Sequence, residues 1–300
     1  MSDKNTTGGL SALSAEIGQI ARVAEASIVR VHARRGPTGS GFVWRPGLIV
    51  SAEEAVEVDD GIHITLANGT RAAATLVGRD PSTDVALLRC DAATAQLSGG
   101  IGTASIGQLA IALGCGRRGQ RVSLAMIASV AGPWQSLQGG HLDQFVDLDM
   151  RFDRGMEGAA LLSPEGALIG MVAAGPRHTS IAIPAATIER VAAQLLARGR
   201  IARGYVGLGL QPVHIAPAPG AAAGHSGVMV MSLDANGPGM AAGMLQGDIV
   251  LSWNGEAVGG MRDVMRRLGS EAVGQTVDLA LQRAGQPASV RLTIGERPTT

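Results

Sequence analysis

Aromatic residues and cysteines are scarce in this chain of 300 residues. Phe, Trp and Tyr together make up 2% of it, and its two cysteines are Cys90 and Cys115. Two isolated cysteines match no metal-binding spacing, so a cysteine-based metal site is excluded. We therefore expect a reduced, buried pair of thiols, and a core built from Val, Leu, Ile, Ala and Met.

The charge balance and the lack of long apolar runs exclude further classes of protein. Basic and acidic residues number 25 each, so the formal net charge is zero, which argues against binding to nucleic acid or an anionic surface. No apolar run approaches the ~20 residues of a membrane helix. Residues 1–5 lack the basic and apolar regions of a secretory signal. These absences predict a cytoplasmic globular protein without nucleic-acid or membrane partners.

What the chain does contain is a long series of short strands. They are separated by Gly, Pro and Asn turns and run from Ser27 to Ile183, and among them are Leu48–Ser51, Arg71–Gly78, Val85–Arg89 and Phe145–Asp149. Short, evenly spaced strands predict an antiparallel barrel or a pair of barrels rather than βαβ units. Two stretches, Leu10–Ala26 and Ala185–Arg198, have apolar residues at helical spacing, and Gly199 ends the second helix.

A second, smaller unit follows the second helix. A loop is predicted over Pro212–Ser226 and a helix around Met261–Leu268. Strands are predicted at Val228–Leu233, Asp248–Trp253, Val277–Arg283 and Ser289–Ile294. This pattern is typical of a small β-sandwich with two helices. We therefore divide the chain into an N-terminal tail and helix (1–26), a first domain (27–200) and a second domain (201–300).

The stretch with the most distinctive chemistry is the turn Gly155-Met156-Glu157-Gly158, between predicted strands at 145–149 and 167–172. Chymotrypsin-like proteases present their nucleophile on a Gly-X-Z-Gly turn. Its first Gly lets two backbone N–H groups converge into an oxyanion hole, and Z is serine. Here Z is Glu157, whose carboxylate cannot attack as an alkoxide. We expect this carboxylate to accept the N–H groups that would otherwise hold an oxyanion.

Several motifs in the same order resemble the HtrA/Deg family, and the resemblance covers nearly the whole chain. They are Gly39–Val43, Val77–Leu88, Ala182–Pro184, Arg203–Gly207 and Leu245–Gly255. The resemblance implies a mostly β protein, in which a chymotrypsin-like double β-barrel is followed by a PDZ β-sandwich with two helices.

The catalytic positions of the family can be located one at a time. In the segment Ser51–Val56, Glu54 stands where the family has its histidine, whereas the family's aspartate is retained as Asp84. Glu157 stands where the family has its serine. A triad needs the histidine to move the proton of the nucleophile, and the aspartate only orients it. The resemblance therefore predicts a pseudoprotease that is not an enzyme, with Glu54, Asp84 and Glu157 as degenerate triad positions.

In this fold the three carboxyl groups should lie within a few ångströms of one another, where like charges repel strongly. They could share a proton with a raised pKa, bind a hard cation such as Ca²⁺ or Mg²⁺, or be neutralised by Arg154 or Arg151. We expect the last arrangement, or carboxylates that point apart, and no metal or other cofactor. A hydrolase or metal-binding protein that uses this cluster is the alternative.

The family resemblance also assigns a peptide-binding site to the second domain. PDZ domains add the C-terminus of a partner as a strand to a sheet edge and hold its carboxylate with backbone N–H groups. The residues predicted to form this groove are Tyr205, Val206, Gly207, Leu208, Met265 and Leu268. An apolar, methionine-containing pocket favours partners with an apolar C-terminus or an unfolded apolar segment.

The main prediction is an inactive HtrA-like adaptor, assembly factor or chaperone that works by binding proteins. A structural subunit of a larger complex is a further alternative. A homo-oligomer is also possible in principle. The family trimerises through aromatic residues near the start of the protease domain, but no aromatic precedes Phe42, so a trimer is not expected. Two loop histidines, His141 and His178, fall where the family's loops border the active site, and we expect both to be solvated.

Overall fold

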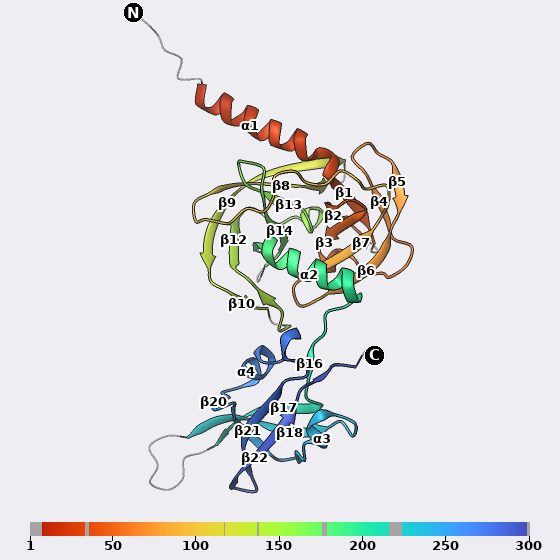
Figure 1. Cartoon of the computed structure of the whole chain (residues 1–300). Helices are drawn as coiled ribbons and strands as arrows, with labels where there is room; N and C mark the ends of the chain where they lie inside the picture. Colours follow the sequence, from red (N-terminus) through yellow and green to blue (C-terminus); the bar gives the residue numbers. More distant parts are fainter. Residues whose placement is uncertain are drawn as a thin grey trace, which may run out of the picture. The chain divides into compact units, whose positions relative to one another are not determined.

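The chain divides into two compact units, an N-terminal unit (Met1–Ile201) and a C-terminal unit (Ala202–Thr300). Figure 1 shows the computed structural model, in which residues 8–33, 36–116, 118–136, 138–175, 179–215 and 224–298 are described. Within these ranges, no helix is both long and apolar enough to cross a membrane.

The N-terminal unit begins with helix α1 (Gly8–Ala24), which continues into a 3-10 turn at Glu25–Ser27. The predicted helix Leu10–Ala26 is therefore confirmed with slightly shifted ends. Ile17 and Ile20 pack against the core of the unit, whereas Leu10 is 83% exposed. Figure 1 shows this helix (red) extending away from the strands.

Seven antiparallel strands form the first sheet, in the order β5-β4-β1-β2-β3-β7-β6. Their bounds are β1 (Ile28–His32), β2 (Gly39–Arg45), β3 (Leu48–Ser51), β4 (His63–Thr65), β5 (Arg71–Ala73), β6 (Thr75–Asp80) and β7 (Val85–Arg89). The sequence predicts one strand from Arg71 to Gly78, but the chain changes partner after Ala73. β5 pairs with β4, and β6 pairs with β7.

The second part of the N-terminal unit is a closed barrel with the order β12-β15-β14-β13-β8-β9. Its strands are β8 (Leu109–Gly116), β9 (Gly119–Ala131), β12 (Phe145–Asp149), β13 (Ala160–Leu162), β14 (Leu168–Ala174) and β15 (Ser180–Pro184). A small separate ribbon pairs β10 (Trp134–Gln135) with β11 (His141–Leu142). β8 is almost wholly buried, whereas β9 has many exposed residues.

One hydrophobic core joins the first sheet, the barrel and helix α2 (Ala185–Arg198), with members such as Phe42, Met171 and Ile188. The helix packs on strands of both sheets. It ends at Gly199, whose φ of 69° is the left-handed conformation expected at this position.

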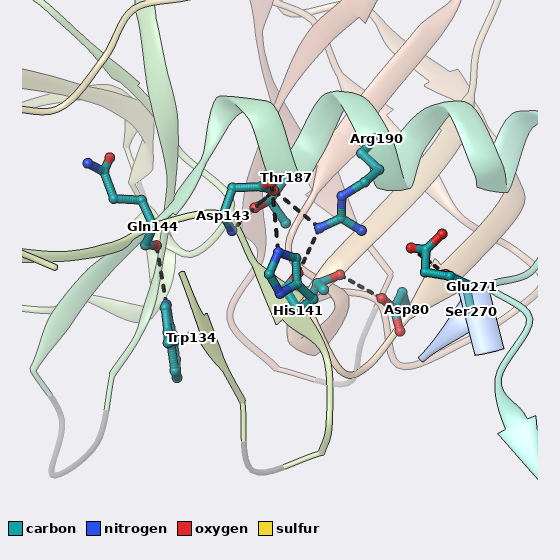
Figure 2. Close-up of polar contacts among 10 residues, drawn as sticks. Asp80, Trp134, His141, Asp143, Gln144, Thr187, Arg190, Ser270 and Glu271 are labelled. Carbon is teal, nitrogen blue, oxygen red and sulfur yellow. Dashed lines mark hydrogen bonds and ion pairs between the residues drawn. The ribbon is translucent and has the colours of Figure 1, made fainter. Parts of the chain in front are cut away.

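Helix α2 is also held by polar contacts, shown in Figure 2. The Thr187 hydroxyl donates to a carboxylate oxygen of Asp143 at 2.7 Å, and the Arg190 guanidinium donates to the same oxygen at 3.2 Å. Arg190 also donates to the carbonyl of His141. These contacts fix the loop between β11 and β12 against the helix.

The C-terminal unit is built on a sheet with the order β17-β18-β19-β21-β22, so β17 is an edge strand. Its elements are β16 (Gly204–Tyr205), β17 (Leu208–Ile215), β18 (His225–Leu233), α3 (Pro238–Ala241), β19 (Ile249–Trp253), β20 (Glu256–Ala257), α4 (Met261–Arg266), β21 (Thr276–Arg283), β22 (Gln286–Thr293) and β23 (Gly295–Glu296). Its core contains Val230, Trp253 and Leu279. The sequence predicts a loop over Pro212–Ser226, but residues up to Ile215 continue β17.

Candidate functional site

The loop before β7 positions Asp84. Asp80 is buried, and its two carboxylate oxygens accept hydrogen bonds from the hydroxyls of Ser82 and Thr83, each at 2.7 Å. These bonds close the loop tightly, and Asp84 follows it with a φ of 55°. A left-handed conformation is uncommon for residues other than glycine but is tolerated by Asp and Asn. The loop therefore holds the Asp84 carboxyl group in a defined place at the start of β7.

Glu54 lies directly beside Asp84. The 3-10 turn Glu53–Ala55 follows β3, and its backbone meets the 80–84 loop at two points. The Glu54 N–H donates to the Asp84 carboxylate at 3.0 Å, and the Glu53 N–H donates to the Asp84 carbonyl at 3.2 Å. The Glu54 side chain is exposed, whereas Asp84 is half-buried.

Glu157 comes from the turn after β12 and is only 3% exposed. Two hydrogen bonds from Ser40 on strand β2 hold this turn in place. The Ser40 N–H donates to the Glu157 carbonyl at 2.8 Å, and the Ser40 hydroxyl donates to the Gly155 carbonyl at 2.6 Å. Gly158 has a φ of 83°, and a Cβ there would lie 2.2 Å from the Ser40 carbonyl oxygen. Only glycine can follow Glu157 in this arrangement.

The Gly155 N–H, at the first glycine of this turn, donates to a neighbour in the chain. Asp153 caps the short helix Arg154–Met156, and its carboxylate accepts from the Gly155 N–H at 2.8 Å. The Asp153 carbonyl also accepts from the Met156 N–H. The Gly155 N–H therefore donates to Asp153, and acceptance of backbone N–H groups by the Glu157 carboxylate stays a prediction.

Burial raises the pKa of Asp84, the hydrogen bond from the Glu54 N–H lowers it, and the charges of Glu54, Glu157 and Glu53 raise it, so that the net pKa is about 8. Asp84 is consequently protonated in most molecules at neutral pH. The charges of both Glu54 and Glu157 affect the pKa of Asp84. The structure therefore brings Glu54, Asp84 and Glu157 within electrostatic range of one another, and we call these three residues the carboxylate site.

Of the arrangements open to the three carboxyl groups, the raised pKa of Asp84 corresponds to the protonated one. Within the described residues, no group of three or more His, Cys, Asp or Glu side chains could hold a metal ion. A guanidinium nitrogen of Arg79 lies 3.6 Å from a carboxylate oxygen of Glu53. Arg151 lies near Asp153 and lowers its pKa.

Of the two histidines predicted in loops, His141 is exposed and lies beside α2 (Figure 2). Its Nε2 is 4.0 Å from a carboxylate oxygen of Asp143. His178 lies outside the described residues.

The second candidate site is the loop Tyr205–Leu208 in the C-terminal unit. Gly207 has a φ of 67°, and a Cβ there would lie 2.7 Å from the Gly237 Cα. The Gly207 carbonyl accepts from the Asp234 N–H at 2.9 Å, and the Tyr205 hydroxyl donates to the Asp234 carboxylate at 2.8 Å. The turn that contains Gly237 thus fixes the loop from one side.

Beyond this loop, helix α4 packs beside the edge strand β17. Val206 is buried, while Leu208 and Leu268 are partly buried against the core of the unit. Met265 on α4 is half-buried. An edge strand beside a helix, with a glycine-containing loop at its start, is the arrangement to which an extended peptide can add as a further strand.

Family models match both units. A trypsin-like peptidase domain matches residues 39–171, and a PDZ domain matches residues 204–294. A probable periplasmic serine endoprotease DegP-like of Brucella suis is 30% identical over 282 residues, covering 89% of this chain and 54% of that protein. The corresponding protein of Halomonas elongata is 30% identical over 276 residues, covering 88% and 57%. The chain thus spans about half the length of the curated relatives it matches.

Solved structures agree with this assignment. The serine endoprotease from Yersinia pestis has a TM-score of 0.73 and 27% identity, covering 94% of this chain and 98% of that one. The HtrA-type protease AlgW with decapeptide has a TM-score of 0.73 at 21% identity, with 95% and 99% covered, and shows the fold alone. The chain therefore joins a trypsin-like peptidase domain to a PDZ domain. It belongs to the HtrA/DegP-like family, and the predicted fold class is confirmed.

Two predictions from the sequence are contradicted. The relatives are named serine endoproteases, which are enzymes, so the prediction that this chain is not an enzyme is wrong. They are also named periplasmic, which overturns the prediction of a cytoplasmic location. Both predictions had been drawn from absences, either of two triad residues or of a recognisable leader.

The sequence interpretation missed two residues that shape the turn. Asp153 lies two positions before Gly155, and an aspartate before a short helical turn is a recognisable capping signal. Ser40 bridges the two sheets, because its hydroxyl accepts from the Cys115 N–H at 2.7 Å while donating to Gly155. No local pattern marks that role, because its partners lie far away in the chain.

Proposed function

We propose that this chain binds the C-termini of protein partners through its PDZ domain. The observation that carries the proposal is the edge position of β17 beside α4, with the Tyr205–Leu208 loop at the start of the strand. The peptide would pair with β17, while its terminal carboxylate accepts hydrogen bonds from the backbone of the loop.

The pocket for the last side chain is apolar. Val206 and Leu208 come from the loop and the start of β17, and Met265 and Leu268 come from α4 and the segment that follows it. Methionine is flexible and adapts to side chains of different shape. We therefore expect peptides that end in a small or branched apolar residue to bind best.

Fluorescence polarisation with the full chain tests this proposal. One labelled peptide ends in valine with a free carboxylate, and its partner has the same sequence with an amidated C-terminus. Loss of hydrogen bonds to a charged group should weaken the amide by about tenfold or more. Equal affinity of the two peptides would contradict capture of the carboxylate.

Variants locate the binding site on the surface. Met265→Lys places a charge in the apolar pocket and should abolish the difference between the free acid and the amide. Met231→Lys is the matched control, because Met231 is an exposed methionine of the same unit. Substitution of Gly207 is less suitable here, since the side chain would clash with Gly237 and strain the fold. Equal effects of the two lysine variants would contradict the assignment.

On this basis we propose that the chain acts in the cell as an adaptor or assembly factor. The same groove would let it act as a chaperone that binds unfolded segments with apolar ends. The alternative is a structural subunit, in which the groove makes a fixed interface. A pull-down from native lysate with the unaltered chain and with Met265→Lys separates the two. A partner lost in the variant supports the adaptor, and a partner retained by both supports the subunit.

Peptide hydrolysis in the peptidase domain is a second candidate function. The name of the relatives favours it, and Asp84, with a pKa of about 8, could act as a general acid at neutral pH. Glu157 has a carboxylate and no hydroxyl, so the attacking group would be a water activated by a carboxylate.

Because the relatives are named periplasmic, we also propose a periplasmic location, which cell fractionation tests.

Hydrolysis is measured with an unfolded protein substrate, such as reduced casein, and mass spectrometry of the products. Activity that depends on protonated Asp84 should fall as the pH rises through about 8 and should be lost in Asp84→Asn, which cannot deliver the proton. The control is Asp60→Asn, an exposed aspartate of the same unit. Activity that is equal in both variants would exclude Asp84 as the acid.

The oligomeric state is a separate proposal. The N-terminal end of α1, with Leu10 exposed, is a candidate contact between copies. Light scattering of the full chain and of Leu10→Glu measures the mass of each. The same mass at all concentrations in both proteins would contradict a contact through this helix.

A further inference from the structure

A cavity of about 630 Å³ lies beside the turn that carries Glu157. The end of β8 and the start of β9 form one wall, residues 37–38 before β2 form another, and Asp153, Arg154 and Gly155 form the third. The carboxylate site does not contribute to this lining. The cavity is therefore a feature separate from the carboxylate site.

The charges that line this cavity are mostly positive. Arg118, Arg121 and Arg154 line it together with a single carboxylate, Asp153. This local excess stands out in a chain whose formal net charge is zero. A concave site with charges mainly of one sign attracts ligands of the opposite sign.

A further arginine lies behind one wall. The Arg30 guanidinium donates to the Gly116 carbonyl at 2.6 Å, and Gly116 lines the cavity. The Arg30 Nε is buried and has no hydrogen-bond partner. A partly buried guanidinium with an unused donor adds positive potential to that wall.

The chain itself shows which chemistry these groups accept. The Asp153 carboxylate pairs with Arg121 and also accepts from the Gly155 N–H. The Gly155 N–H and Arg121 both lower the pKa of Asp153. A carboxylate therefore already occupies one edge of the cavity, held by a guanidinium and a backbone N–H, while Arg118 is exposed and lines the remaining space.

The size and the lining of the cavity favour a peptide over a small anion or a nucleotide. The volume far exceeds that of inorganic phosphate. No aromatic side chain is among the described residues that line it, so nothing offers a base a stacking surface. The cavity also borders the turn of a trypsin-like domain, past which a bound chain would run.

We propose that this cavity is a subsite for Asp or Glu side chains of a bound peptide, recognised by Arg118, Arg121 and Arg154. The proposal rests on the proposed role of the chain in peptide binding, but it concerns the peptidase domain and not the PDZ groove. Arginine suits this role because its planar guanidinium matches the two oxygens of a carboxylate.

Fluorescence polarisation with amidated peptides tests the proposal without help from the PDZ groove. One labelled peptide contains Asp-Glu-Asp between Gly and Ser residues, and its matched partner contains Asn-Gln-Asn. We expect the acidic peptide to bind the full chain and the neutral one to bind at least about fivefold more weakly. Binding of the acidic peptide should also weaken as salt is raised.

Three variants make the test specific. Arg118→Ala should weaken the acidic peptide by about fivefold, whereas Arg89→Ala, an exposed arginine on β7, should leave its affinity unchanged. Asp153→Asn should strengthen binding severalfold, because asparagine keeps the helix cap but removes the competing charge. A gain of affinity cannot be explained by a damaged fold.

The proposal is overturned if the acidic and neutral peptides bind equally, or if Arg118→Ala and Arg89→Ala weaken binding alike. It is also overturned if inorganic phosphate protects the chain from thermal unfolding while the acidic peptide does not bind, since the cavity is then a small-anion site. Failure here is distinguishable from failure of the PDZ proposal, because Met265→Lys should alter only the binding of peptides with a free, apolar C-terminus.

Discussion

The most direct test of the carboxylate site is the pH dependence of stability in Asp84→Asn. Asparagine resembles the protonated aspartate, because its carbonyl can still accept from the Glu54 N–H, now at 3.0 Å. It also tolerates the φ of 55° at this position. The substitution should therefore preserve the loop while removing the titrating group.

The expected size follows from the pKa of about 8 in the folded chain. In the unfolded chain the same carboxyl group ionises near pH 4. The raised pKa in the folded state means that the stabilisation is complete below about pH 4 and is lost as the pH rises through 8. Each pH unit within this window removes up to about 1.4 kcal/mol. Between pH 6 and pH 8, the unaltered chain should lose about 2 kcal/mol relative to Asp84→Asn.

Urea unfolding followed by tryptophan fluorescence at pH 6, 7, 8 and 9 measures this difference. Trp44 and Trp134 report on the N-terminal unit, and Trp253 reports on the C-terminal unit. Any transition of the C-terminal unit should be the same in both proteins and serves as an internal control. If the two unfolding free energies of the N-terminal unit change in parallel from pH 6 to pH 9, Asp84 is already ionised and the argument from burial is refuted.

Two further predictions concern residues that stabilise each unit, Asp143 in the N-terminal unit and Gly207 in the C-terminal unit. Asp143→Asn should cost the N-terminal unit about 1 kcal/mol through weaker bonds to Thr187 and Arg190. Burial raises the pKa of Asp143, but the bonds to Thr187 and Arg190 outweigh burial, so the net shift of this pKa is downward. The stabilisation by Asp143 should therefore disappear as the pH falls below about 4. Acid unfolding of the unaltered chain and of Asp143→Asn measures this loss. Gly207→Ala should destabilise the C-terminal unit by about 2 kcal/mol, because a Cβ at φ 67° meets the Gly237 Cα at 2.7 Å. An unchanged urea midpoint would contradict this.

The fold was largely predictable because buried runs are bounded by clear turn signals. Strands Leu48–Ser51, Val85–Arg89 and Phe145–Asp149 have the predicted ends, as does the helix Ala185–Arg198. The break after Ala73 was not predictable from pattern, since the chain remains extended and changes only its pairing partner. The sequence predicts a loop at Pro212, but this residue lies in an edge strand, where proline is tolerated because the missing N–H does not disrupt the sheet.

The candidate site was less predictable. Resemblance to a family supplied the positions of Glu54, Asp84 and Glu157, but the direction of a pKa shift depends on burial, which spacing does not reveal. The pairing of Arg121 with Asp153 joins residues 32 positions apart, and no local pattern indicates it. The inference from missing triad residues to a missing activity failed for a related reason, because the sequence pattern does not show what else the site contains.

The short turn Arg154–Met156 separates two regions of opposite charge. On one side, Glu157 lies in electrostatic range of Asp84, where burial and repulsion between carboxylates favour protonation. On the other side, Asp153 lies among arginines that lower its pKa. The net charge of zero conceals this division, because the two regions offset each other in any sum over the chain. A peptide that crosses the turn would therefore meet carboxyl groups on one side and guanidinium groups on the other. Such a gradient fixes the direction in which a peptide of mixed charge can lie, because the reversed peptide would place like charges together.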